Sequence, residues 1–192
     1  MDMNVILNFI LVSGALVLIG GVVKFLIKAV SGPHPMLNKM CTIKFYDQDG
    51  DIVPISDYGG KMLIIEHASW IGQYYALKDR LSKFENGKNV WIQNDEIQWI
   101  IFYQSCVSDQ ITYDLKKALE LIGKENIAIP CPILLDKDAE FWQNFNGEDC
   151  YQGYLILDRK GIVRCVPGQM KSTDYYETLI NNLLNENNSD KI

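Results

Sequence analysis

The chain has 192 residues, of which 48% are hydrophobic and 22% are charged, and its formal net charge is −6. These values are those of an ordinary folded protein, and they exclude a disordered chain and a multi-span transporter. The negative charge, without a basic stripe or an arginine-rich run, excludes general nucleic-acid binding because no track for phosphates is present.

The first predicted element is a membrane-spanning helix. The nineteen residues 5–23 carry no charge, and at ~1.5 Å of rise per residue they nearly match a hydrocarbon core of ~30 Å. The alternative is a cleaved signal peptide, but Asp2 precedes the stretch without any Lys or Arg, and no small-residue cleavage site follows it. We therefore predict a single-pass membrane protein with residues 1–30 as its N-terminal transmembrane anchor.

The lysines beside this span predict its orientation. Lys24, Lys28 and Lys39 follow the span and none precedes it, so the positive-inside rule places the N-terminus outside and the rest of the chain on the cytoplasmic or matrix side. Residues 31–39 are predicted to be a linker, because Pro33 and Pro35 prevent the helix from continuing.

Residues 40–185 are predicted to form one α/β domain, since the ~160 residues after the anchor suit one sizeable core better than two. Residues 41–55 alternate around a turn and predict an opening β-hairpin. The apolar runs 62–65 and 97–103 predict two buried strands, and the amphipathic helix between them makes a right-handed crossover with parallel strands. The apolar positions of that helix are Tyr74, Leu77, Leu81 and Phe84.

The second half of the domain continues the alternation of helices and strands. Residues 132–136 predict a short strand, residues 141–145 a brief helix, and residues 154–165 a final hairpin. Residues 186–192 are polar and predict a disordered tail. The two longer helices of this half are predicted from apolar stripes at Ile111, Leu115, Ala118, Leu119 and Ile122, and at Tyr176, Leu179, Ile180, Leu183 and Leu184.

The cysteines of the chain form no recognisable framework. They are odd in number, no two are closely spaced, and the spacing is not that of a zinc site. These features predict no disulfide scaffold. Because His34 and His67 are the two histidines, the sequence also predicts no metal site and no cofactor. The five cysteines are Cys41, Cys106, Cys131, Cys150 and Cys165.

Two segments resemble those of membrane-anchored thioredoxin-like proteins. Residues 68–74 read Ala-Ser-Trp-Ile-Gly-Gln-Tyr, which resembles the Ala-Ser-Trp-Cys-Gly-Pro-Cys motif of that family, and residues 154–161 resemble the strand and turn after its cis-proline loop. Residues 55–61 and 132–136 also fit the redoxin branch, which includes peroxiredoxins. The resemblance covers most of residues 40–185. It implies a thioredoxin-like three-layer α/β/α sandwich with a mixed central sheet and an N-terminal β-hairpin, preceded by one transmembrane helix.

The redox site that the resemblance implies is degenerate in this chain. In the family, the first cysteine lies at a helix N-terminus, where backbone amides and the helix dipole stabilise its thiolate. That position is Ile71 here, the second cysteine is replaced by Tyr74, and the proline between them is Gln73. Trp70 and Gly72 are the parts of the motif that remain.

Other members of the superfamily fit no better. The cis-proline position falls near Gln152, so that feature is also predicted to be lost. A peroxiredoxin mechanism needs a cysteine at the same helix start, and the iodothyronine deiodinases would place their reactive residue at about Gly72.

Two functions of different classes stay open on these residues. The first is a non-catalytic binding or assembly component, an accessory subunit of a membrane complex with a protein partner, because a fold can outlast the loss of its site. The second is an atypical thiol-disulfide oxidoreductase that uses Cys106 and Cys150, both expected near the sheet edge where ligands bind. Isolated cysteines are more often buried and unreactive, which favours the first hypothesis.

Two further pairs of residues are candidates for function. Glu66 and His67 end the first central strand, but their side chains should point to opposite faces, which favours a structural histidine over an acid–base pair. Trp91 and Trp99 flank a long connection, residues 88–98. A partner or the lipid surface is predicted to be met there, and core packing is the alternative for Trp99, which lies inside the strand pattern.

Overall fold

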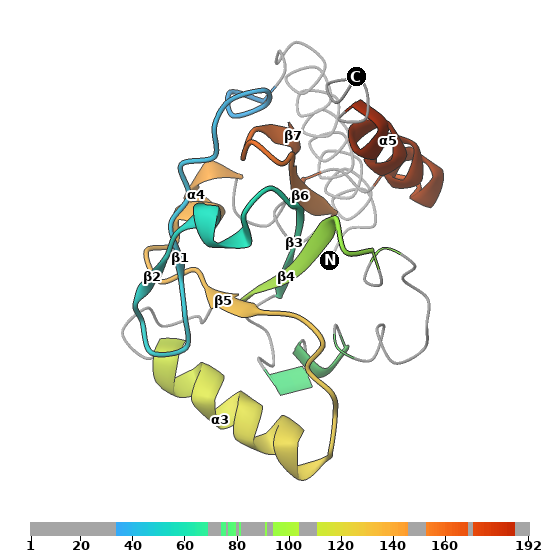
Figure 1. The fold of residues 1–192 in the computed structure, drawn as a ribbon. Coiled ribbons are helices and arrows are strands. Elements are labelled where there is room, and N and C mark those ends of the chain that lie inside the picture. Colours follow the sequence, from blue (N-terminus) through green and yellow to red (C-terminus); the bar gives the residue numbers. More distant parts are fainter. Residues whose placement is uncertain are drawn as a thin grey trace, which may run out of the picture. The chain divides into compact units, whose positions relative to one another are not determined.

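The computed structural model describes residues 34–68, 74–75, 77–79, 81, 91, 94–103, 111–145, 153–168 and 171–186. The chain divides into two compact units, Met1–Pro35 and Met36–Ile192, and Figure 1 traces the elements of the second. The predicted span, residues 5–23, lies outside the described residues. Within the residues that are described, no helix has the length and apolar character needed to cross a bilayer.

One mixed sheet organises the second unit. Its order is β2-β1-β5-β4-β3-β6-β7; β3, β4 and β5 run parallel, and β6 and β7 run antiparallel to the strand beside them. This confirms the predicted mixed α/β sheet with an N-terminal hairpin. The strands are β1 (Phe45–Tyr46), β2 (Ile52–Val53), β3 (Met62–Ala68), β4 (Ile97–Tyr103), β5 (Ile133–Leu135), β6 (Tyr154–Leu157) and β7 (Val163–Cys165).

The central strands are apolar throughout because both of their faces are covered, as is usual for parallel strands. Every residue of β3 is buried, and it extends three residues beyond the predicted run 62–65. One face of the sheet packs against a cluster that includes Leu77, Leu115 and Ile180. The other face packs against a cluster that includes Phe141.

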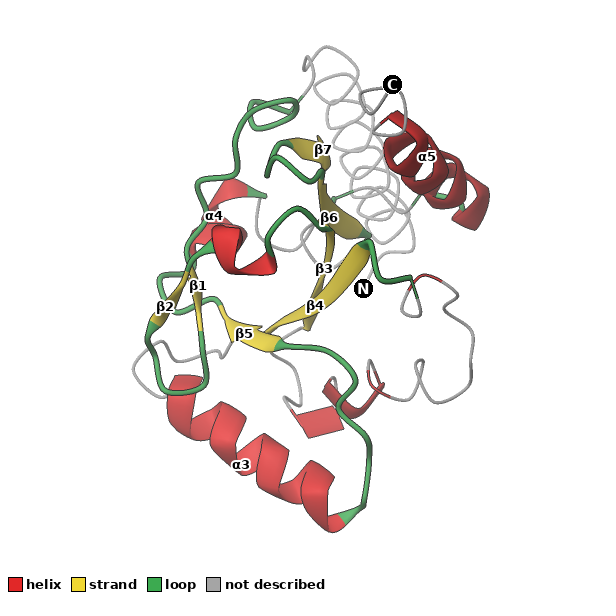
Figure 2. Cartoon of the chain, in the orientation of Figure 1, coloured by secondary structure: helices red, strands yellow, loops and turns green. Residues whose placement is uncertain are grey.

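The helices differ between these two faces (Figure 2). The first face is covered by α3 (Ile111–Lys124), by α5 (Thr173–Glu186) and by the helical residues 74–75, 77–79 and 81. The second face is covered by the short α4 (Glu140–Asn144) and by the 3-10 helix η1 (Ile55–Tyr58). The predicted stripes are confirmed at the buried positions Leu115, Ala118, Ile122, Tyr176, Ile180 and Leu183.

Both predicted ends of the domain differ from the structure. The domain begins at Met36 rather than at residue 40, because the backbone amide of Asn38 donates to the carbonyl of Val163 (2.7 Å) and holds this part of the predicted linker against β7. The last helix, α5, includes Glu186, which was predicted to belong to the tail. Helix ends are commonly misplaced by one or two residues.

Candidate functional site

The carboxyl ends of the three parallel strands form the edge where a site is expected in such a sheet. Ala68, Tyr103 and Leu135 end β3, β4 and β5 and lie beside one another in register. The degenerate motif begins at Ala68, so the chain leaves the sheet at this edge. Trp70, Ile71, Gly72 and Gln73 lie outside the described residues, and so does Gln152.

Glu66 and His67 lie beside this edge but on opposite faces of β3, as the alternation of a strand predicts. The His67 ring is 1% exposed and stacks on Phe141 with centroids 5.0 Å apart. The Glu66 carboxylate is 6% exposed and acts electrostatically on Cys131, which belongs to the other core cluster. The two side chains therefore cannot act together as an acid–base pair.

Asp136 is a buried carboxylate at the same edge that sequence reasoning missed. It directly follows β5, its backbone amide donates to the carbonyl of Tyr103 (2.9 Å), and its side chain accepts a hydrogen bond from the amide of Phe141 (3.2 Å). Asp136 therefore fixes the start of α4 and places Phe141 against His67. The available signal was an acidic residue at the end of an apolar strand, just before a short helix.

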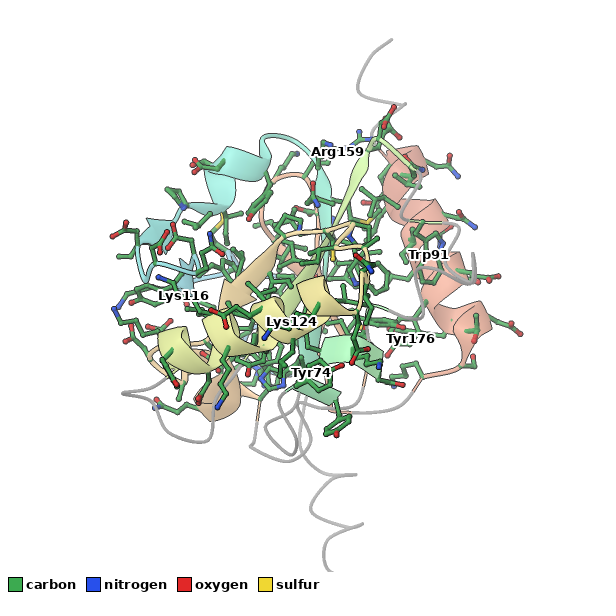
Figure 3. All side chains as sticks on the ribbon, turned by 90° about the horizontal axis from the view of Figure 1, so that it is seen from below. Tyr74, Trp91, Lys116, Lys124, Arg159 and Tyr176 are labelled. Atoms are coloured by element: carbon green, nitrogen blue, oxygen red, sulfur yellow. The ribbon has the colours of Figure 1, made fainter. Side chains whose placement is uncertain are left out.

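Tyr74, which the sequence resemblance aligns with a motif cysteine, belongs to a polar cluster with Lys78 and Glu125. Its phenol donates a hydrogen bond to the Glu125 carboxylate, which also accepts one from the Lys78 ammonium. The Lys78 nitrogen lies 5.7 Å from the centre of the Tyr74 ring. Figure 3 shows Tyr74 near Lys124, the residue that precedes Glu125. This cluster ties the helical segment that contains Tyr74 to the end of α3.

The charges of this cluster shift the pKa of each member. The hydrogen bond to Glu125 raises the pKa of Tyr74, and bonds from Lys78 and then Tyr74 lower the pKa of Glu125. The same carboxylate raises the pKa of Lys78. All three groups thus keep their usual charge states at neutral pH, and Tyr74 stays a protonated phenol that cannot replace a thiolate.

Glu125→Gln is expected to lower the pKa of Tyr74 toward about 10, because the neutral amide no longer favours the protonated phenol. The pKa can be followed by NMR in protein labelled with ¹³C-tyrosine. Glu120→Gln, in the adjoining helix α3, is the matched control and should leave the titration unchanged. An unchanged Tyr74 pKa in Glu125→Gln would show that the cluster does not form in solution.

The described thiols are poor nucleophiles. Cys41, Cys131 and Cys165 are free and buried. Burial raises the pKa of each thiol, and for Cys131 burial followed by the charge of Glu66 raises the pKa to about 12. Cys106 and Cys150, the pair of the oxidoreductase hypothesis, lie outside the described residues.

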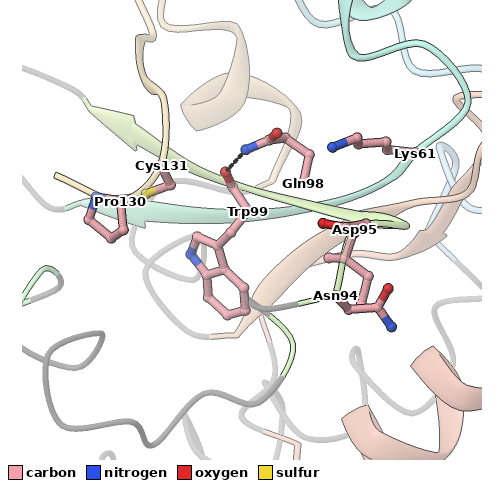
Figure 4. Close-up of a pocket in the computed structure, with 8 residues that line it drawn as sticks. Lys61, Asn94, Asp95, Gln98, Trp99, Pro130 and Cys131 are labelled. Atoms are coloured by element: carbon pink, nitrogen blue, oxygen red, sulfur yellow. Dashed lines mark hydrogen bonds between the residues drawn. The ribbon is translucent and has the colours of Figure 1, made fainter.

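A small hollow lies at the opposite, amino edge of the parallel strands (Figure 4). It measures about 130 Å³. Trp99 is 3% exposed at its base and stacks on Trp91 with centroids 6.4 Å apart. This confirms the core-packing alternative for Trp99. The lining residues are Lys61, Asn94, Asp95, Ile97, Gln98, Trp99, Pro130 and Cys131.

By sequence, the chain matches no family model and no curated protein. By structure, it resembles a proposed thiol-disulfide oxidoreductase from Bacteroides vulgatus, with 13% identity, 79% of this chain and 99% of that chain covered, and a TM-score of 0.53. It also resembles copper-bound Sco1 from yeast, with 15% identity, 79% and 94% coverage and a TM-score of 0.51. A proposed thioredoxin from Neisseria meningitidis gives 12% identity, 76% and 89% coverage and a TM-score of 0.51.

Proposed function

From the thioredoxin-like fold of this chain, we propose that it is a membrane-anchored binding or assembly component that has lost the redox chemistry of the family's standard site. The observation that carries the proposal is the replacement of both motif cysteines, by Ile71 and Tyr74. An alkyl side chain cannot attack a disulfide, and the Tyr74 phenol is engaged by Glu125. With the scaffold kept and the nucleophile absent, the surface of the domain is what remains for function.

The buried thiols support the same proposal. A thiol reacts as its thiolate, and a pKa raised by burial leaves very little thiolate at neutral pH. Cys41, Cys131 and Cys165 therefore offer no substitute nucleophile. The partner in this proposal is a protein of a membrane complex, bound by the domain while residues 1–30 hold it at the bilayer.

The anchor is part of the proposal and rests on the uncharged residues 5–23, with Lys24, Lys28 and Lys39 favouring a domain on the cytoplasmic or matrix side. The full chain should stay with membranes after an alkaline carbonate wash. Leu16→Arg should release a large fraction of it, because a central arginine costs roughly 2.5–3.5 kcal/mol of insertion free energy. Release of the unchanged chain by carbonate would overturn the anchor.

Thiol trapping in intact cells, read by mass spectrometry, tests whether redox chemistry has moved elsewhere. We expect free thiols at Cys106 and Cys150, and we expect the Cys106→Ala/Cys150→Ala variant to enter the same detergent-solubilised complex as the unchanged chain on a native gel. A Cys106–Cys150 disulfide that exchanges with added reductant, together with loss of cellular function in the double variant, would instead support the oxidoreductase.

A further inference from the structure

The chain enters its domain at the amino edge of the parallel strands. Met40 forms a β-bridge with Ile162, and the amide of Val163 donates to the carbonyl of Lys39 (2.8 Å). Ile162 directly follows the turn that joins β6 to β7, and β6 ends at Leu157 opposite Leu63, the second residue of β3. Figure 1 shows the blue start of the domain beside this turn.

The surface at this entry point combines an exposed apolar side chain with two exposed lysines. We define the entry face as Lys39, Met40 and Lys160. Met40 is 56% exposed although its sulfur lies only 3.2 Å from where a Cβ on Gly161 would stand. Lys39 and Lys160 are exposed and form no ion pair with a described residue.

The neighbouring carboxylates do not cancel the charge of the entry face. Arg164 pairs with Asp158 (2.8 Å) and also with Glu186 (3.2 Å), and Arg159 pairs with Glu96 (2.7 Å). With the two lysines, four cations therefore face three carboxylates, which leaves a net positive charge around Met40 on a chain whose total charge is −6. Lysines that flank an exposed apolar side chain are suited to an anionic lipid surface, where each cation is attracted by the headgroups and the apolar group enters the acyl boundary.

We propose that the entry face rests on the anionic surface of the bilayer; this rests on the proposed N-terminal anchor. Residues 24–35 separate the predicted span from the domain, and at up to ~3.5 Å each they keep Met36 within ~40 Å of the membrane. The entry face lies at the start of the domain, so it is the surface nearest along the chain to the proposed anchor. The carboxyl edge with the degenerate motif then faces away from the bilayer, about 20 Å further out across the seven residues of β3.

Methionine methyl NMR on the full chain in lipid nanodiscs tests this orientation. The nanodiscs contain phosphatidylcholine with or without phosphatidylserine, and a lipid with a gadolinium-loaded headgroup broadens nearby signals. Met40 is assigned with Met40→Leu, and Tyr113→Met supplies a second exposed reporter at the start of α3, near the carboxyl edge. With phosphatidylserine present, we expect strong broadening of Met40 and little of the reporter at position 113.

Charge variants separate electrostatic docking from simple tethering. Lys39→Gln/Lys160→Gln should weaken docking roughly 25-fold, since each lysine near an anionic surface is worth roughly fivefold. The matched pair Lys117→Gln/Lys124→Gln on α3 changes the charge equally and should leave Met40 broadened. Salt at ~1 M, where the Debye length falls to ~3 Å, should reduce the broadening.

The outcomes distinguish the two proposals. If the full chain does not remain with lipid after a carbonate wash, the anchor fails. If it remains with lipid but Met40 and position 113 broaden equally, or if Met40 broadens equally without phosphatidylserine, the anchor stands and the entry face is not a lipid-docking surface.

Discussion

Phe141→Ala is expected to lower the free energy of unfolding by about 3–5 kcal/mol, the usual cost of removing a buried phenylalanine ring. Phe141 is 0% exposed and lies at the centre of the cluster beneath α4. Its ring meets those of Phe145, His67 and Phe102 at centroid distances of 4.8, 5.0 and 5.1 Å. The cavity would also deprive His67 of the ring on which it stacks.

Urea unfolding followed by circular dichroism measures this loss. Tyr75→Ala is the matched aromatic control, because Tyr75 is 72% exposed, and it should change stability by no more than about 0.5 kcal/mol. A loss below about 1 kcal/mol in Phe141→Ala would mean that α4 does not cover His67 as the structure shows.

Cys131 is expected to resist alkylation at pH 8 about a thousand times more strongly in the folded chain than in the unfolded chain. Its pKa is raised from 9.0 to about 12, so at pH 8 roughly one thiol in 10⁴ is ionised in the folded state against roughly one in ten when unfolded. Iodoacetamide labelling with mass spectrometry measures the rate at Cys131, and the same chain in urea is the control.

The direction of the pH dependence follows from the same shift. Between pH 9 and 12 the folded state binds more protons than the unfolded state at Cys131, so folding stability falls as the pH rises through this window. Below pH 9 the contribution of the protonated Cys131 thiol to folding stability is fully present. Folded-state labelling should therefore accelerate about tenfold per pH unit toward pH 12. Equal labelling rates with and without urea at pH 8 would show that Cys131 is not buried in solution.

Much of the sheet could be predicted because each strand is indicated by a pattern within one short stretch of sequence. β3 and β4 are continuous apolar runs, and continuous runs indicate strands covered on both faces. The apolar stripe of α3 could be predicted for the same reason, since residues three and four apart share a helix face. The opposite facing of Glu66 and His67 also follows from the alternation of a strand.

The interactions at the candidate site could not be predicted because they depend on contacts between distant residues or on the geometry of a loop. Tyr74 meets Glu125 across 51 positions, and neither residue marks the other in sequence. Asp136 and Phe141 are only five positions apart, but their hydrogen bond depends on the loop that leads into α4 rather than on periodicity. The attachment of Asn38 to Val163 was hidden by the two prolines before it, which indicate a linker.

The opening hairpin bears on the order in which the domain folds. β1 joins the rest of the sheet through one register pair, Tyr46 with Leu135, and the Tyr46 phenol bonds Asp138 across 92 positions. Closing so long a loop is entropically costly until β5 is already in place. The hairpin is therefore expected to complete the sheet late, so the parallel strands and the edge they form can assemble before the outer strands are added.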